Sequence, residues 1–195
     1  LRFSAAGVAP SRTILVLAMV GSLIGAVSLS GSIIAWAKLD GRMDKRYTFP
    51  GMQIFNACVA VLTVVLGIMA ITTLGVPWII AFFISALALG VLMTLPIGGA
   101  DMPVVISLYN ALTGLAVAFE GYVLGIETLI IAGMMVGAAG ILLTRLMAKA
   151  MNRPISGVLF SSFGGGGGEM QEITGAQKPI EAGDVAAMMA FAERV

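Results

Sequence analysis

The side chains best suited to chemistry lie on one side of a single apolar segment, residues 102–124. At about 100° per residue, the polar and small residues of this segment share an arc of about 160° on a helix. They are Ser107, Tyr109, Asn110, Thr113, Gly114, Glu120 and Gly121. The opposite arc is bulky and apolar. Because such a helix turns its polar side to other helices or to water, the segment is the best candidate for a pathway through an apolar protein.

Asn110 is the central polar group of this arc. It lies seven residues past Pro103, which is roughly 10 Å along a helix at 1.5 Å per residue. An amide donates and accepts hydrogen bonds at once, so it can hold a water molecule in a chain that conducts protons. The alternative is an ordinary hydrogen bond between helices, worth about 0.6 kcal/mol in a membrane protein. The spacing favours neither.

Two carboxylates flank the arc. Asp101 precedes the segment, where it could cap the helix or guard the mouth of a path. Glu120 lies roughly 26 Å along the axis from Pro103, near the far end of the span. There it could relay protons or reach the surrounding water.

The composition of the whole chain limits the alternatives. Of its 195 residues, 59% are hydrophobic and 11% are charged, and the mean hydropathy is +1.03. A soluble domain carries about 25% charged residues. With no histidine, one cysteine and a formal charge of +1, the chain lacks the means for a disulfide scaffold, a cysteine zinc site, a Ser-His-Asp triad or a basic nucleic-acid surface. The composition therefore indicates a membrane protein.

The distance between charges predicts the helices, since a span needs about 20 apolar residues. Charges are absent from residues 13–37, 47–100, 102–119 and 128–144. The second gap is too long for one helix, and proline interrupts it at Gly75-Val76-Pro77. We expect an all-α, polytopic transmembrane bundle within residues 13–153. Its five predicted helices cover about 13–37, 53–74, 78–95, 102–124 and 127–149.

The ends of the chain have a different character. Residues 1–12 form a polar lead, and residues 154–195 form a glycine-rich linker and a polar tail. Because basic residues mark cytoplasmic loops, the clusters at 38–46 and 149–153 predict a lead outside and a cytoplasmic C-terminus. The sequence opens at Leu1, and we expect a piece of a longer chain.

Stripes of small residues predict where the helices pack. Spacings of three and four residues let two helix backbones approach closely in lipid. The candidate packing residues are Gly21, Gly25, Gly114, Gly133, Gly137 and Gly140.

Four stretches resemble a known family. GGADMPVVISLYNALTG (98–114), LMAKAMNRPISGVL (146–159) and GAVSLSGSIIAWAKL (25–39) are similar to the membrane domain of the beta subunit of proton-translocating NAD(P) transhydrogenase. KPIEAGDVAAMM, near the end of the chain, resembles the linker before the NADP(H)-binding domain of that subunit. The first of these stretches is the most specific.

The resemblance implies a translocase that transfers hydride from NADH to NADP+ in soluble domains and couples this to proton entry through the membrane. This chain would be the second half of the membrane part, would bind no cofactor and would transfer no hydride alone. NAD(H) and NADP(H) would bind in partner domains. The implied partners are the lipid bilayer, the alpha subunit and the NADP(H)-binding domain, in a homodimeric complex of the bacterial cytoplasmic membrane.

The resemblance also assigns residues. Asn110 matches the polar residue of the proton path and Asp101 the carboxylate at its cytoplasmic mouth, and we place Ser107, Thr113 and Glu120 on the same path. Three further residues, Lys149, Asn152 and Arg153, match the basic hinge to the soluble domain. The chain departs from the family in lacking its usual membrane histidine and in having Ala138 and Ala139 where serines are frequent.

Two other functions remain open from the residues. In a fragment of a secondary transporter, the polar arc would line a substrate site at mid-membrane. In a structural scaffold, the glycine stripes would only assemble subunits. No second copy of the GGADMP pattern supports the inverted repeat that a transporter would have.

Overall fold

The computed structural model describes residues 11–43, 47–49, 51–152 and 154–155. These residues form five helices that are long and apolar enough to cross a membrane, and no strand lies among them. The helices are α2 (Arg12–Leu39), α3 (Met52–Thr73), α4 (Val76–Thr94), α5 (Met102–Leu124) and α6 (Glu127–Ala150). A short 3-10 turn, η1 (Gly99–Asp101), precedes α5. The all-α prediction is confirmed, and no predicted helix end differs from the observed one by more than two residues.

The break inside the long charge-free stretch has a clear local cause. Leu74 ends α3 in the left-handed region, with φ of 50°, and Gly75 is extended. Pro77 then lies in the first turn of α4, where its missing N–H removes no helix hydrogen bond. The chain therefore turns back with only two residues between the helices.

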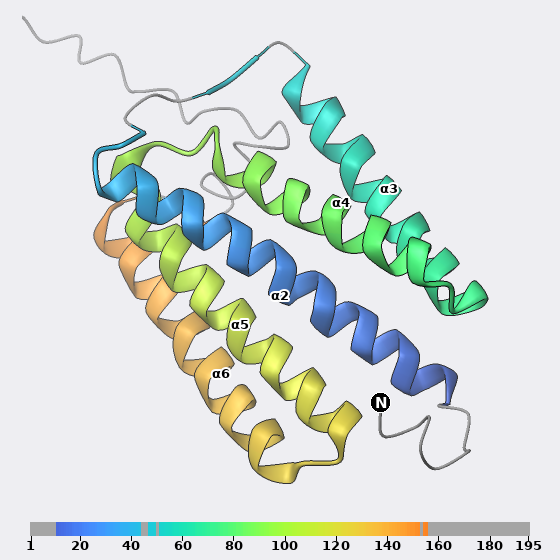
Figure 1. The fold of residues 1–195 in the computed structure, drawn as a ribbon. Coiled ribbons are helices and arrows are strands. Elements are labelled where there is room, and N and C mark those ends of the chain that lie inside the picture. Colours follow the sequence, from blue (N-terminus) through green and yellow to red (C-terminus); the bar gives the residue numbers. More distant parts are fainter. Residues whose placement is uncertain (1–10, 44–46, 50, 153, 156–195) are drawn as a thin grey trace, which may run out of the picture.

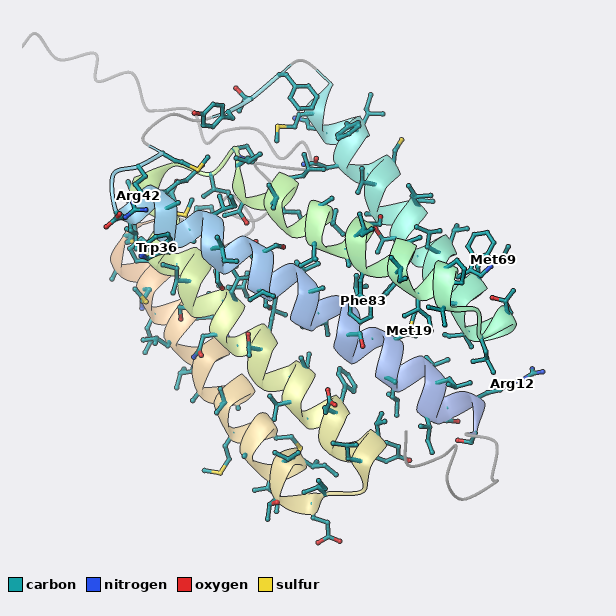
Figure 2. All side chains as sticks on the ribbon, in the orientation of Figure 1. Arg12, Met19, Trp36, Arg42, Met69 and Phe83 are labelled. Carbon is teal, nitrogen blue, oxygen red and sulfur yellow. The ribbon has the colours of Figure 1, made fainter. Side chains whose placement is uncertain are left out.

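The helices pack in an order that differs from their order in the chain. Side by side they run α6, α5, α2, α4, α3, so that α2 separates α5 from α4 (Figure 1). The packing is closest between α5 and α6. Large apolar side chains such as Leu29, Ile68 and Leu142 are exposed, as expected in hydrocarbon. Figure 2 shows side chains projecting outward along the helices of the array. The arrangement makes the span Gly99–Leu124, which contains α5, the most enclosed, with 44% of its most apolar 18 residues buried against 22–28% in the other four spans.

The main apolar cluster lies at one end of the array. At this end α2, α4 and α6 finish and α5 begins (Figure 1). The exposed side chains of Arg42 and Lys149 also lie at this end, and we call it the basic end. The buried members of the cluster come from α2, the α4–α5 connection, α5 and α6: Ala35, Ile97, Met102, Val104, Val105, Tyr109 and Ala148. The start of α5 is therefore held from three sides.

Most of the predicted lead (1–12) and tail (154–195) lies outside the described residues, and these boundaries stay predictions.

Candidate functional site

The polar arc of α5 is divided between two environments. Its buried members face neighbouring helices, and they are Ser107, Tyr109, Gly114 and Gly121. Its exposed members are Asn110, Thr113 and Glu120. We call these the inner side and the outer side of α5. α2 and α6 are the helices that pack most against α5, and the flank that carries the exposed residues is covered by neither.

On the inner side, hydroxyl groups join α5 to α6. The Thr144 hydroxyl donates to the Gly140 carbonyl at 2.7 Å and lies 3.1 Å from the Ser107 hydroxyl. Ser107 Oγ is also 3.5 Å from the same carbonyl. Ser107, placed on the expected proton path, is thus engaged in a buried contact between helices.

Tyr109 connects three helices. Its hydroxyl lies 2.7 Å from Thr94 Oγ1, and Thr94 donates its own proton to the Gly90 carbonyl at 2.8 Å, so Tyr109 is the donor to Thr94. The tyrosine ring covers Gly31 of α2, where an added Cβ would lie 2.5 Å from the ring. Thr94 was not predicted, because a single hydroxyl near a helix end carries no pattern of its own.

The glycines differ in how closely they pack. A Cβ at Gly114, Gly133 or Gly140 would lie within 3.0 Å of backbone atoms of the facing helix. At Gly21 the nearest atom would be the Phe119 Cβ, at 3.2 Å. Gly137 would make only ordinary contacts, the nearest at 3.6 Å, and Gly25 would meet nothing within 4 Å. Among the predicted packing glycines, the closest approaches therefore lie between α5 and α6. Gly90, which was not predicted, brings α4 equally close to α2, because its added Cβ would lie 2.5 Å from the Val27 carbonyl oxygen.

The outer side faces away from the other four helices. The Thr113 hydroxyl donates to the Tyr109 carbonyl of its own helix at 2.8 Å. The side chains of Asn110 and Glu120 are exposed. The sequence pattern had suggested that the hydrophilic flank of α5 lines a path between the helices. Within the described residues, Asn110, Thr113 and Glu120 do not line such a path inside the five helices. Any water path at Asn110 requires a second wall from outside this chain.

Asp101 lies where the connection from α4 enters α5. Asp101 is 7% exposed and occupies the N-cap position of α5, where its side chain makes no capping hydrogen bond. Asp101 therefore stands at the N-terminus of α5 without capping it through a side-chain hydrogen bond. The carboxylate is buried at the basic end, six residues before Ser107, the first residue of the inner side.

From the sequence, Lys38 was placed in the basic loop after the first helix. It instead belongs to the last turn of α2, and its side chain is 6% exposed. A signal for this was present, because Lys38 follows Gly31 and Ala35 at helical spacing and continues their packing face. Lys38 is the charged residue that the sequence pattern failed to place.

The expected hinge begins where α6 ends. Lys149 lies exposed in the last turn, and Asn152 has φ of 52°, a left-handed conformation that asparagine tolerates and that ends the helix. Arg153 lies outside the described residues. In the part of the chain that the structure describes, no three His, Cys, Asp or Glu side chains come close enough to hold a metal ion.

Together these features define a polytopic α-helical membrane protein whose most enclosed span has a buried inner side with two hydrogen-bonded hydroxyls and a polar outer side. The family model described as "NAD(P) transhydrogenase beta subunit" matches residues 4–195. The NAD(P) transhydrogenase subunit beta of Rhodospirillum rubrum is 42% identical over 149 residues, which is 76% of this chain and 32% of the relative, and a strain of the same species gives the same values. The chain belongs to the NAD(P) transhydrogenase beta subunit family. It spans about a third of the length of these relatives.

Proposed function

We propose that this chain is part of the proton-translocating membrane portion of NAD(P) transhydrogenase. In this proposal, proton entry is coupled to hydride transfer from NADH to NADP+, which takes place in separate soluble domains. Family membership supports the assignment to the complex. The single structural observation that supports a role in proton movement is the exposed Asn110 on the outer side of a membrane-length helix.

Lipid tails cannot form hydrogen bonds with the Asn110 side chain. Polar groups at membrane depth face protein or water, because hydrocarbon offers them no hydrogen-bond partner. We therefore propose that the outer side of α5 forms one wall of the path and that another helix of the complex forms the second. Asn110 and Thr113 would lie on this wall, and Glu120 would lie toward its far end. Ser107 would contribute by fixing α6 against the back of the wall.

The basic end would face the cytoplasm, since it carries Lys149 and Arg42. Asp101 would then stand at the cytoplasmic mouth, and Lys149, Asn152 and Arg153 would link α6 to an NADP(H)-binding domain. The further partners would be the alpha subunit and a second copy of the complex, in the bacterial cytoplasmic membrane. NAD(H) and NADP(H) would bind in partner domains, with no cofactor on this chain.

The test is Asn110→Leu in the full complex. We expect proton-coupled transhydrogenation to fall at least about tenfold, equivalent to about 1.4 kcal/mol, because the variant removes the hydrogen-bonding group from the wall. A cyclic reaction that exchanges hydride on bound NADP(H) should persist. The measurement consists of the rates of the coupled and the cyclic reaction, together with proton uptake by vesicles that contain the complex.

Two variants complete the design. Asn110→Gln keeps an amide and should retain most of the coupled rate, and Leu115→Ala, on an apolar flank of the same helix, should leave coupling unchanged. Normal proton pumping by Asn110→Leu would remove Asn110 from the mechanism. Loss of complex assembly with an unaltered rate per complex would instead favour the structural scaffold.

A further inference from the structure

Lys38 makes a set of contacts that the proposed proton path does not use. From the last turn of α2, its ammonium group donates to three backbone carbonyls at the end of α4 and just beyond it. The acceptors are Ile97 at 2.6 Å, Thr94 at 3.3 Å and Leu95. These residues lie more than 50 positions away in the chain, so the contact joins two distant segments.

The end of α4 leaves carbonyls for which such a donor is needed, although the Thr94 carbonyl also accepts from the Ile97 N–H at 3.2 Å. The last carbonyls of any helix lack intrahelical donors. Here no left-handed glycine closes the helix, since Leu95 is right-handed with φ of −55° and ψ of −44°, and Pro96 has no N–H to donate. The last turn of α4 also contains no basic residue. Lys38 supplies from another helix the cation that favours a helix C-terminus.

The same contact sets the course of the connection to α5. Pro96, Ile97 and Gly98 are buried, and Ile97 packs in the cluster that contains Ala35, one turn before Lys38. Only Gly99 and Ala100 are exposed before the chain reaches the buried Asp101. The connection is therefore not a free loop, because its first half is fastened to α2.

We propose that Lys38 is a positioning residue that holds the connection 95–101, and with it Asp101, in a fixed place on α2. This inference rests on the proposed function. A soluble domain that acts on Gly99 and Ala100 would then displace α2, α4 and the start of α5 as one body. Without the ammonium, the carbonyls would lose charge-assisted hydrogen bonds. A displacement of the connection would then no longer move α2 with it.

The test compares Lys38→Met with Arg42→Met in the full complex. Arg42 is a matched control because it lies at the same end, but its side chain is 68% exposed, pairs with Asp40 at 2.6 Å and lies over Trp36. In Lys38→Met we expect amide hydrogen exchange at residues 97–101 to accelerate at least about tenfold through local opening. We also expect the ratio of coupled to cyclic transhydrogenation to fall at least about fivefold. Arg42→Met should change neither.

A purely structural role would lower the coupled and cyclic rates in parallel with the amount of assembled complex, and that result would overturn the proposal. Unchanged exchange at residues 97–101 would also overturn it. If the complex that carries Lys38→Met does not assemble, Lys38→Gln, which keeps two N–H donors, replaces it. The ratio of coupled to cyclic transhydrogenation in that variant then decides. If neither variant assembles, Lys38 is structural and the proposal fails.

The two readouts separate this inference from the function on which it rests. If the unmodified complex moves no protons, the proposed function fails, while the exchange measurement still reports whether Lys38 holds the connection. If the unmodified complex is coupled and Lys38→Met is equally coupled, only the inference fails.

Discussion

The inner and outer sides of α5 lie on one helix and satisfy their polar groups in different ways. On the inner side, the hydroxyls of Ser107 and Tyr109 meet partners on α6 and α4, and glycines bring α6 into backbone contact. On the outer side, Thr113 bonds only to its own helix, and Asn110 is exposed. The inner side therefore holds this array together, whereas the outer side is available to something beyond it.

The most severe way to test this comparison is to force α5 and α6 apart. A Cβ at Gly133 would lie 2.6 Å from the Gly114 carbonyl oxygen and 2.8 Å from the Ala118 Cα, backbone atoms that cannot rotate away. We expect Gly133→Ala to destabilise the protein by about 2 kcal/mol or more. The measurement is the thermal midpoint of the purified complex, with size-exclusion chromatography used to monitor the amount of intact complex after heating. Gly25→Ala is the control and should be neutral or slightly stabilising, since its Cβ meets nothing within 4 Å. Equal effects of the two variants would contradict the packing described for α5 and α6.

A smaller effect is expected where the inner side depends on one hydrogen bond. Tyr109→Phe keeps the ring over Gly31 but removes the donor to Thr94. The expected loss of stability is about 0.6 kcal/mol and at most about 1.7 kcal/mol, the range for such bonds between membrane helices. A double-mutant cycle with Thr94→Val measures the interaction directly. A coupling energy near zero would mean that the two hydroxyls do not depend on each other.

The smallest effect is expected on the outer side, where two adjacent residues sharpen the comparison. Glu120 is exposed, and Glu120→Gln should change stability by less than about 0.5 kcal/mol. For Gly121, the next residue, an added Cβ would lie 2.7 Å from the Ile130 amide nitrogen. Gly121→Ala should therefore lower the thermal midpoint clearly. If Glu120→Gln proved the more damaging of the two, the assignment of inner and outer sides would be reversed.

The sequence predicted correctly those features that depend only on the order of residues along the chain. Helix ends follow from the positions of charges along the chain and from Pro77 and Pro103. A charge is disfavoured in hydrocarbon and a proline disrupts a helix interior, whichever helices lie beside it. The family was also recognisable from the stretch around Asp101 and Asn110, and the family model and the relatives support it.

The site was only partly predictable. The arc on α5 grouped Ser107 with Asn110, although the structure buries one and exposes the other. Periodicity gives the angle between two side chains on a helix, but it does not say where the neighbouring helices stand. Lys38 was misplaced for the same reason, since its acceptors on and after α4 come from more than 50 residues away.

The sequence by itself determined that the chain has five membrane-length helices, where each begins and ends, and to which family it belongs. Only the tertiary structure decided that α2 stands between α5 and α4, that one flank of α5 is open, and that a lysine fastens the connection to Asp101. The reason is that lipid is as apolar as leucine, so hydrophobicity drives a segment into the membrane without choosing its neighbours. That choice comes from close packing at glycines and from a few buried hydrogen bonds, and both exist only after the helices have met.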